Sequence, residues 1–226
     1  EWLWGYREND RLGGKDPYSA SKACAELITK VYMESFFKEK GPNIATTRAG
    51  NVIGGGDWAL DRVVPDCVRA WSKGKKVEIR NPNATRPWQH VLEPLSGYLV
   101  LGQQLFQGNP ELKNQSFNFG PQAKVNQSVG DLITEMAQYW PEAKWKFEQE
   151  MNSDKPESTL LKLNCDKALQ LLQWNSVLDF SKTVQMTGKW YQDFYSQKPS
   201  SILETTSRQI EEYTKLATQS NLVWAQ

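Results

Sequence analysis

The stretch DPYSASKACAE (Asp16–Glu26) opens a helix, and a strand follows it at residues 43–48. Asp16 is a residue that caps free backbone N–H groups at a helix start, and Pro17 fits the first helical turn. The apolar spacing that follows continues this helix toward residue 38. Because a helix that leads into a strand is the repeating unit of an α/β protein, this stretch indicates the fold class.

The rest of the chain extends this pattern. The expected helices span residues 61–73, 92–107, 128–139, 166–172 and 181–195, with one polar helix after residue 200. The expected strands span residues 77–80, 116–119, 144–147 and 160–163, and residues 85–91 are extended. Elements alternate in the first half and are shorter and mixed in the second, so we expect an α/β fold with a parallel sheet and an appended lobe.

Composition excludes several classes of function. The 226 residues have a net charge of +1 and contain no long run of one sign, which gives no reason to expect a nucleic acid partner. No apolar run approaches the roughly 18 residues that a membrane span needs. Three scattered cysteines and one histidine do not make a zinc site, and they suggest a reduced, cytoplasmic protein. His90 alternates with Trp88 in an extended segment, which favours a structural role over a catalytic one.

Tyr18 and Lys22 are four residues apart on the first helix, so their side chains point to the same side. An ammonium group next to a phenol stabilises the phenolate, which can then take a proton from a substrate hydroxyl. The same spacing also occurs by chance in many helices. Small residues between the two and a glycine cluster after the next strand favour the catalytic interpretation.

Several longer motifs carry a resemblance to a known family. PYSASKACAE, TTRAGNVIGGGDW and RPWQHV resemble the catalytic helix, the following strand and loop, and a later segment of the extended short-chain dehydrogenases/reductases. Within that superfamily, EWLWGYREND, VEIRNPNATRPWQHVLEPLSGYL and PESTLLKLNCDKA are most similar to CDP-glucose 4,6-dehydratases. The resemblance covers nearly all of residues 1–200. It implies the C-terminal part of a Rossmann-type parallel sheet with a smaller mixed α/β lobe that binds substrate.

The resemblance also implies a cofactor and a set of site residues. The cofactor is NAD, and the substrate is CDP-glucose or a related nucleotide sugar. Catalysis is assigned to Tyr18 and Lys22, which together with Ala49, Gly50 and Val52 also contact the cofactor. Substrate binding is assigned to Asn51, Arg62, Arg80, Arg86 and Glu157. Guanidinium groups bind phosphate through paired hydrogen bonds, although surface arginines are more often merely solvated.

The domain boundaries follow from the same resemblance. Residues 1–53 and 88–120 form the expected NAD-binding part, residues 54–87 and 121–200 the sugar-nucleotide lobe, and residues 201–226 a C-terminal helix and tail. The chain begins with Glu1 and lacks the glycine-rich turn that holds a pyrophosphate, so we expect it to be an N-terminally truncated fragment without turnover of its own. Family members commonly form homodimers or tetramers.

Three functions remain open from the sequence. The first is NAD-dependent dehydration of CDP-glucose to CDP-4-keto-6-deoxyglucose for deoxysugar or O-antigen synthesis. The second is another nucleotide-sugar epimerase or 4,6-dehydratase of the superfamily. The third is a truncated protein that binds a nucleotide sugar without catalysis. The run Trp190–Tyr195 has helical spacing, which is typical of packing rather than of a platform for a base.

Overall fold

The structure is a computed structural model that describes residues 4–38, 40–79, 81–122, 126–147, 161–196 and 202–226. Its helices are α1 (Pro17–Ser35), α2 (Val63–Trp71), α3 (Leu92–Phe106), α4 (Val129–Ala137), α5 (Asp166–Leu172), α6 (Phe180–Tyr195) and α7 (Ile202–Gln219). Its strands are β1 (Thr46–Ala49), β2 (Asn51–Ile53), β3 (Val77–Ile79), β4 (Thr85–Arg86), β5 (Trp88–His90), β6 (Ser116–Phe119), β7 (Gln127–Ser128) and β8 (Trp145–Phe147). The 3-10 turns η1 (Pro110–Leu112) and η2 (Val223–Ala225) complete the described elements.

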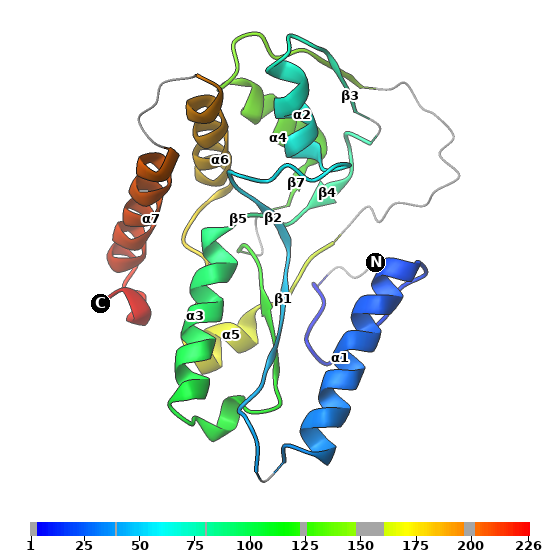
Figure 1. The fold of residues 1–226 in the computed structure, drawn as a ribbon, viewed down its shortest axis with the longest axis vertical. Coiled ribbons are helices and arrows are strands. Elements are labelled where there is room, and N and C mark those ends of the chain that lie inside the picture. The colour runs from blue at the N-terminus through cyan, green and yellow to red at the C-terminus, as the bar shows by residue number, and fades with distance from the viewer. Residues whose placement is uncertain (1–3, 39, 80, 123–125, 148–160, 197–201) are drawn as a thin grey trace.

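The strands pair two by two among the described residues. β1 pairs with β6, β2 with β5 and β3 with β8, all in parallel, whereas β4 and β7 are antiparallel. β1 and β2 form one extended run in Figure 1, and the chain changes its pairing partner between them at Gly50. The Gly50 N–H donates to the Phe119 carbonyl at 3.1 Å, so β1 and β6 end side by side. Parallel pairing is what the alternation of helices and strands predicts.

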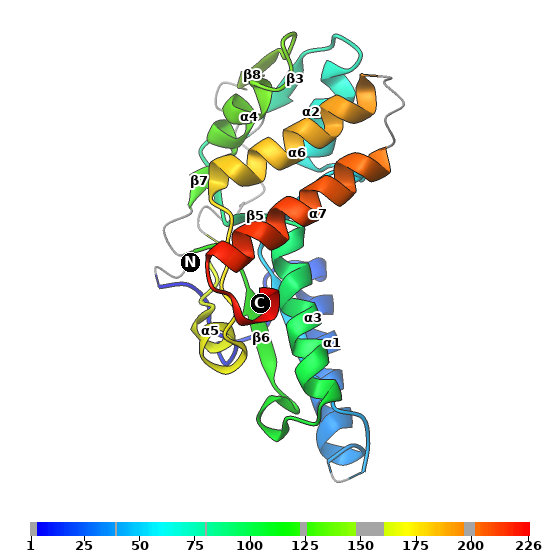
Figure 2. The same cartoon turned by 90° about the vertical axis from the view of Figure 1, so that its left-hand side faces the viewer.

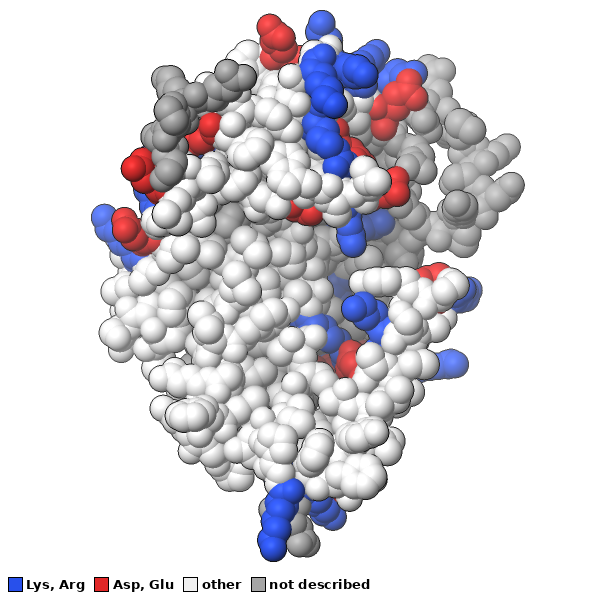
Figure 3. All heavy atoms as spheres, in the orientation of Figure 1, with Lys and Arg blue, Asp and Glu red and all other residues white. Residues whose placement is uncertain are grey.

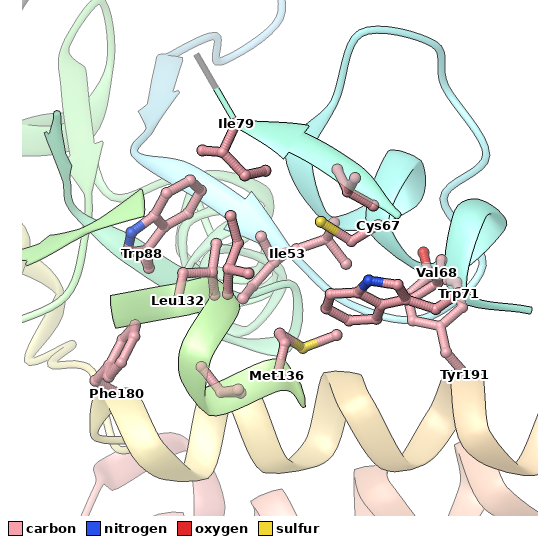
Figure 4. Close-up of a cluster of buried hydrophobic side chains, with 14 residues drawn as sticks. Ile53, Cys67, Val68, Trp71, Ile79, Trp88, Leu132, Met136, Phe180 and Tyr191 are labelled. Atoms are coloured by element: carbon pink, nitrogen blue, oxygen red, sulfur yellow. The ribbon is translucent and has the colours of Figure 1, made fainter. Parts of the chain in front are cut away.

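The upper core is the larger of the hydrophobic clusters and lies between α2, α4 and α6 (Figure 4). Its buried members are Ile53, Val64, Cys67, Val68, Trp71, Val77, Ile79, Trp88, Leu132, Ile133, Met136, Phe180, Val184 and Tyr191. α2 contributes Val64, Cys67, Val68 and Trp71, whose spacing places them on one face of a helix. α4 begins with the predicted capping box, in which Ser128 and Asp131 each accept from the other's backbone N–H.

The lower core packs α3 and α5 against β6 in the lower half of Figure 1. Its buried members are Val100, Leu101, Leu112, Phe117, Phe119, Ala168, Leu172 and Trp174. Figure 2 shows α6 and α7 running side by side, with one end of α7 near α3. α7 therefore touches both halves of the molecule, and Trp224 after it stacks on Tyr213 with ring centres 5.8 Å apart.

The predicted elements differ from the observed ones mainly at their ends. The strand expected at residues 160–163 is wrong: Leu163 forms an isolated parallel bridge with Tyr6, and residue 160 lies outside the described residues. The pairing lasts one residue because the N-terminal segment turns at once, with the Asp10 N–H donating to the Arg7 carbonyl. The helices expected to reach residues 73 and 139 end at Trp71 and Ala137.

Candidate functional site

The Tyr18–Lys22 pair lies in the first two turns of α1. Asp16 caps the helix, because its carboxylate accepts the Ser19 N–H at 2.9 Å and the Ser19 hydroxyl at 2.6 Å. These hydrogen bonds, the side-chain one first, lower the pKa of the Asp16 carboxyl below its ordinary value. The Lys22 Nζ atom lies 5.7 Å from the centre of the Tyr18 ring, and Tyr18 is 66% exposed. The pair therefore occupies one open face of the helix, as its spacing predicts.

An ion pair sets the position of this helix against the strand. Arg48 in β1 donates from Nε to Glu26 Oε1 at 2.7 Å and from Nη2 to Oε2 at 2.6 Å. α1 and β1 run in opposite directions (Figure 1). Lys22 lies about 6 Å before Glu26 along the helix, and Gly50 lies about 7 Å beyond Arg48 along the strand. Lys22 and Gly50 are thus displaced from the ion pair in the same direction and by similar lengths, which favours a position of the helix pair near Gly50.

Gly50 lies close to the segment of residues 87–89, which enters β5. A Cβ atom there would lie 3.1 Å from the Pro87 carbonyl oxygen and 3.4 Å from Gln89 Nε2, so a larger residue would push the two segments apart. Ala49 ends β1 and Asn51 and Val52 open β2, and these three residues are partly or largely accessible. Ligands in parallel α/β sheets bind outside the carboxyl ends of the strands, which is where this segment lies.

Two side chains to which the sequence assigned no role at the site hold the loop of residues 54–62. The Tyr191 hydroxyl donates to the Asp57 carbonyl at 2.7 Å and accepts the Asp57 N–H at 3.2 Å. Arg69 donates to the carbonyls of Trp58 and Ala59 at 2.7 and 3.2 Å. The loop backbone is therefore bound from α6 and from α2 at once. Burial raises the pKa of Tyr191 to about 12, so its hydroxyl keeps its proton.

The glycines of this loop have a packing role that the sequence left undecided. A Cβ atom on Gly55 would lie 2.0 Å from the Trp190 ring, so only glycine lets the loop rest on α6. Trp190 in turn stacks on Phe194, with nearly parallel rings 5.7 Å apart between centres. Tyr191 is fully buried in the upper core. The aromatic run 190–195 is thus a packing surface, as its helical spacing predicts.

Two of the predicted arginines, Arg62 and Arg86, are described and lie in the upper half of the molecule. Arg62 is the exposed residue directly before α2, and Arg86 lies in β4, where its Nη1 donates to the Thr85 carbonyl at 2.8 Å. Figure 3 shows Lys and Arg side chains gathered between this half and α1. Arg80 and Glu157 lie outside the described residues. The Arg48–Glu26 ion pair thus ties the helix of the pair to β1, the strand that leads into Gly50, while the two described arginines belong to another set of elements.

Other titratable residues are poorly placed for catalysis. His90 is buried, its Nδ1 accepts the Leu92 N–H at 3.3 Å, and burial lowers its pKa to about 4. This agrees with a structural role. Burial, with a smaller effect from Asp66, raises the pKa of the Cys67 thiol to about 12. Within the part of the chain that the structure describes, no His, Cys, Asp and Glu side chains gather as a metal site requires, and no helix is long and apolar enough to cross a bilayer.

Most of the chain matches a known protein family. Residues 4–187 match the GDP-mannose 4,6 dehydratase family. The chain belongs to this family. The resemblance to nucleotide-sugar dehydratases that the motifs indicated is thereby confirmed. Within the GDP-mannose 4,6 dehydratase family, the Tyr18–Lys22 helix and the Gly50–Val52 segment are both part of the matched region.

Two relatives differ in their sequence identity to this chain. It is 40% identical to the CDP-glucose 4,6-dehydratase of Salmonella typhimurium (strain LT2) over 224 residues, which are 96% of this chain and 61% of the relative. It is 24% identical to the UDP-glucose 4-epimerase of Mycoplasma pneumoniae over 200 residues, 80% of this chain and 55% of the relative. The chain thus spans about three-fifths of the length of the first relative.

A solved structure confirms the predicted fold class. The dTDP-glucose 4,6-dehydratase from Bacillus anthracis, solved in complex with NAD, superposes with a TM-score of 0.69 at 19% identity, covering 85% of this chain and 57% of that one. The likeness shows that this member of the GDP-mannose 4,6 dehydratase family has a Rossmann-type α/β fold.

Proposed function

We propose that this chain forms the Tyr–Lys side of the active site and the substrate lobe of an NAD-dependent sugar-nucleotide 4,6-dehydratase. The proposed reaction converts CDP-glucose to CDP-4-keto-6-deoxyglucose, a precursor for deoxysugars and O-antigen-type polysaccharides. The observation that carries the proposal is that Lys22 and Tyr18 share one open face of α1, a helix that the Glu26–Arg48 ion pair ties to the strand leading into Gly50. The 40% identity to a CDP-glucose 4,6-dehydratase, against 24% to an epimerase, supports dehydration over epimerisation.

Each residue of the pair has a distinct role in this proposal. Tyr18 takes the proton of the sugar hydroxyl that is oxidised, and the Lys22 ammonium stabilises the phenolate by its charge. The side chains of Ala49 and Val52 and the backbone of Gly50 form the surface beside the pair. NAD, when bound, accepts and returns a hydride. A Cβ atom on Gly50 would face Pro87 and Gln89, so glycine keeps this segment packed against the chain that enters β5.

The substrate contacts are proposed for a second group of residues. Asn51 opens β2 next to Gly50 and binds the sugar, while Arg86 binds the diphosphate. Arg62 and the two residues outside the described part, Arg80 and Glu157, complete the nucleotide pocket. The concentration of positive side chains between α1 and the upper half supports an anionic ligand there (Figure 3).

The division into an NAD-binding part (1–53 and 88–120), a sugar-nucleotide lobe (54–87 and 121–200) and a C-terminal helix and tail (201–226) is part of this proposal. The upper and lower cores agree with this division in part. Ala168, Leu172 and Trp174 of the lobe pack in the lower core, and Ile53 and Trp88 of the NAD-binding part pack in the upper core. A homodimer or tetramer and a cytoplasmic location belong to the proposal as well. The three free cysteines are in keeping with a reducing compartment.

The test measures turnover and binding separately. A gene product that contains this chain is incubated with NAD and CDP-glucose, and the loss of one water from the sugar nucleotide is followed by mass spectrometry. Tyr18→Phe is expected to lower turnover by orders of magnitude, because the phenol that takes the proton is gone, while CDP-glucose binding measured by calorimetry survives.

The matched control is Tyr32→Phe, which makes the same change at an exposed position of α1 and is expected to leave turnover unchanged. Equal turnover in wild type and Tyr18→Phe removes Tyr18 from the mechanism. Inversion at C4 without loss of water favours the epimerase instead. The chain of residues 1–226 alone is expected to bind the nucleotide sugar weakly and to show no turnover.

A further inference from the structure

A buried polar cluster joins α3 to the C-terminal helix. The cluster is a chain of hydrogen-bonding contacts between four side chains. Tyr213 from α7 contacts Glu93 and Ser96 from α3, and Ser96 also contacts Trp174, which follows α5. Glu93 is 1% exposed and Ser96 6% exposed, so both side chains are closed off from bulk solvent. The proposed reaction makes no use of this cluster.

The contacts of Glu93 occupy both of its carboxyl oxygens. Oε1 accepts the backbone N–H groups of Val177 and Leu178 at 2.8 and 2.6 Å. Oε2 lies 2.9 Å from the Tyr213 hydroxyl, which in turn lies 2.9 Å from the Ser96 hydroxyl. Ser96 Oγ lies 2.8 Å from the Glu93 backbone carbonyl. Oε1 therefore has backbone donors. Oε2 is the first of four oxygen atoms in a row, each within hydrogen-bond distance of the next.

The hydrogens in this chain of oxygens can be counted. Three contacts join Glu93 Oε2, the Tyr213 hydroxyl, the Ser96 hydroxyl and a backbone carbonyl, which only accepts. Tyr213 and Ser96 supply one hydrogen each. The Trp174 Nε1–H donates to Ser96 Oγ at 2.9 Å and adds no hydrogen to the three contacts. If Glu93 is ionised, one contact therefore brings two oxygens together without a hydrogen between them.

A protonated carboxyl supplies the missing hydrogen. Glu93 Oε2–H then donates to Tyr213, Tyr213 donates to Ser96, and Ser96 donates to the Glu93 carbonyl, so that every contact is a hydrogen bond. We propose that Glu93 is a neutral carboxylic acid whenever α7 is docked on α3. Docking of the C-terminal helix is then linked to the uptake of one proton.

The surroundings of the carboxyl group agree with a bound proton. Burial raises the pKa of Glu93 to about 7, against smaller lowering effects from Leu178, Tyr213 and Val177. The titratable group that faces it from α7 is Tyr213, whose own pKa is raised by burial and by Glu93. The segment 177–178 offers only backbone N–H groups. His90, three residues before it, is neutral across this range because its pKa is lowered to about 4.

The direction of the pH effect follows from the raised pKa. The stabilisation that the proton provides is complete below the unfolded value of 4.5 and is lost as the pH rises through about 7. Other contacts hold α7 to α6, among them Gln209 Nε2, which donates to the Met186 carbonyl at 2.7 Å. Ionisation of Glu93 is therefore expected to loosen α7 from α3 first, with its contacts to α6 kept.

Glu93→Gln is the variant that tests the proposal on the full chain. The amide has the shape of the neutral acid: its oxygen accepts the two backbone N–H groups, and its nitrogen donates to Tyr213. Between pH 5 and 8 the unfolding equilibrium constant of wild type is expected to rise relative to that of the variant by roughly one to two orders of magnitude. Urea unfolding curves across this range measure the ratio. Glu211→Gln, the same change at an exposed position of α7, is expected to follow wild type.

A second measurement needs no variant to fold. Carboxyl carbons of glutamate labelled with carbon-13 are followed by NMR, and the Glu93 signal is expected to titrate near pH 7. Amide hydrogen exchange in α7, corrected for its intrinsic pH dependence, is expected to speed up over the same range. A Glu93 signal that titrates below pH 5 overturns the proposal, as does a Gln variant that is much less stable than wild type at both pH 5 and pH 8.

Discussion

α2 and α1 differ in how much of their apolar surface they bury. α2 has nine residues, of which Val64, Pro65, Cys67, Val68 and Trp71 are buried. α1 has nineteen residues, of which Met33 alone is buried, while Leu27, Ile28 and Val31 are each more than half exposed. The helix that carries the candidate catalytic pair thus contributes no residue to the upper or the lower core. The Glu26–Arg48 ion pair is a contact that holds it to β1.

Because of this difference, the residues that stabilise the fold are not those that position the candidate catalytic pair. Removal of contacts in the upper core is expected to unfold the protein, whereas removal of the contacts of α1 is expected to move the Tyr18–Lys22 pair without unfolding the rest. Apolar side chains that stay exposed on a helix are also a feature of interaction surfaces. Substitutions in α2, at the contacts of α1 and at the contacts of the loop of residues 54–62 test whether these regions are independent.

Trp71→Ala is expected to have the largest effect, a loss of about 3–5 kcal/mol in the free energy of unfolding. The indole is buried in the upper core and its Nε1–H donates to the Lys144 carbonyl at 3.1 Å, so its removal leaves both a cavity and an unpaired acceptor. Chemical denaturation measures the loss. Trp4→Ala, at a residue that is 70% exposed, is the control and is expected to change stability by less than about 0.5 kcal/mol. Equal losses in the two variants contradict the comparison.

Arg48→Met is expected to have an intermediate effect, about 2 kcal/mol, felt mainly in α1. The substitution removes both hydrogen bonds to Glu26 and leaves that carboxylate without its partner in a largely covered position. Amide exchange in α1 is expected to rise while exchange in α2 and α4 is unchanged.

The control for this variant is Lys30→Met, which breaks the exposed 3.9 Å ion pair with Glu34 on the same helix. Such exposed pairs contribute little, so exchange in α1 is expected to stay as in wild type. If Arg48→Met raises exchange in α2 as much as in α1, the two regions are not independent.

Tyr191→Phe is expected to have the smallest effect on the whole molecule, about 1 kcal/mol. The ring stays in the upper core, and only the hydroxyl that binds Asp57 is lost. The loop of residues 54–62 is expected to exchange faster and nucleotide-sugar affinity to fall severalfold, with no change at α1. Tyr195→Phe, whose ring packs on Trp58 and Trp140, serves as the control. If amide exchange in residues 54–62 is unchanged in Tyr191→Phe, the contacts of Arg69 are sufficient to hold this loop.

The sequence predicts those features that depend on neighbouring residues. Asp16 and Pro17 mark the start of α1, and Ser128 with Asp131 marks the start of α4, because capping involves residues within one turn. The Tyr18–Lys22 spacing likewise needs only the helix period. These local features, with the longer motifs, suffice for the fold class, the family and the centre of the candidate site.

The features that the sequence does not predict depend on partners far along the chain. Gly55 is required by Trp190, and Asp57 is bound by Tyr191, 134 residues away. The same holds for Glu93, which has no local pattern that distinguishes a buried carboxyl from a solvated one. The apolar residues of α1 are a further case. Their spacing indicates a helix, but it does not tell whether another element covers them.

The strand pairing has a consequence for how the protein folds. β1 meets β6 with Thr46 and Ser116 70 residues apart, and the Asn118 side chain donates to the Tyr6 carbonyl 112 residues away. Chains whose contacts join such distant residues lose much conformational entropy before the contacts form, and they fold slowly. The N-terminal segment cannot reach its native place early, because Tyr6 pairs with Leu163, which is synthesised much later. The start of the chain is thus held by residues that are made only after most of the strands.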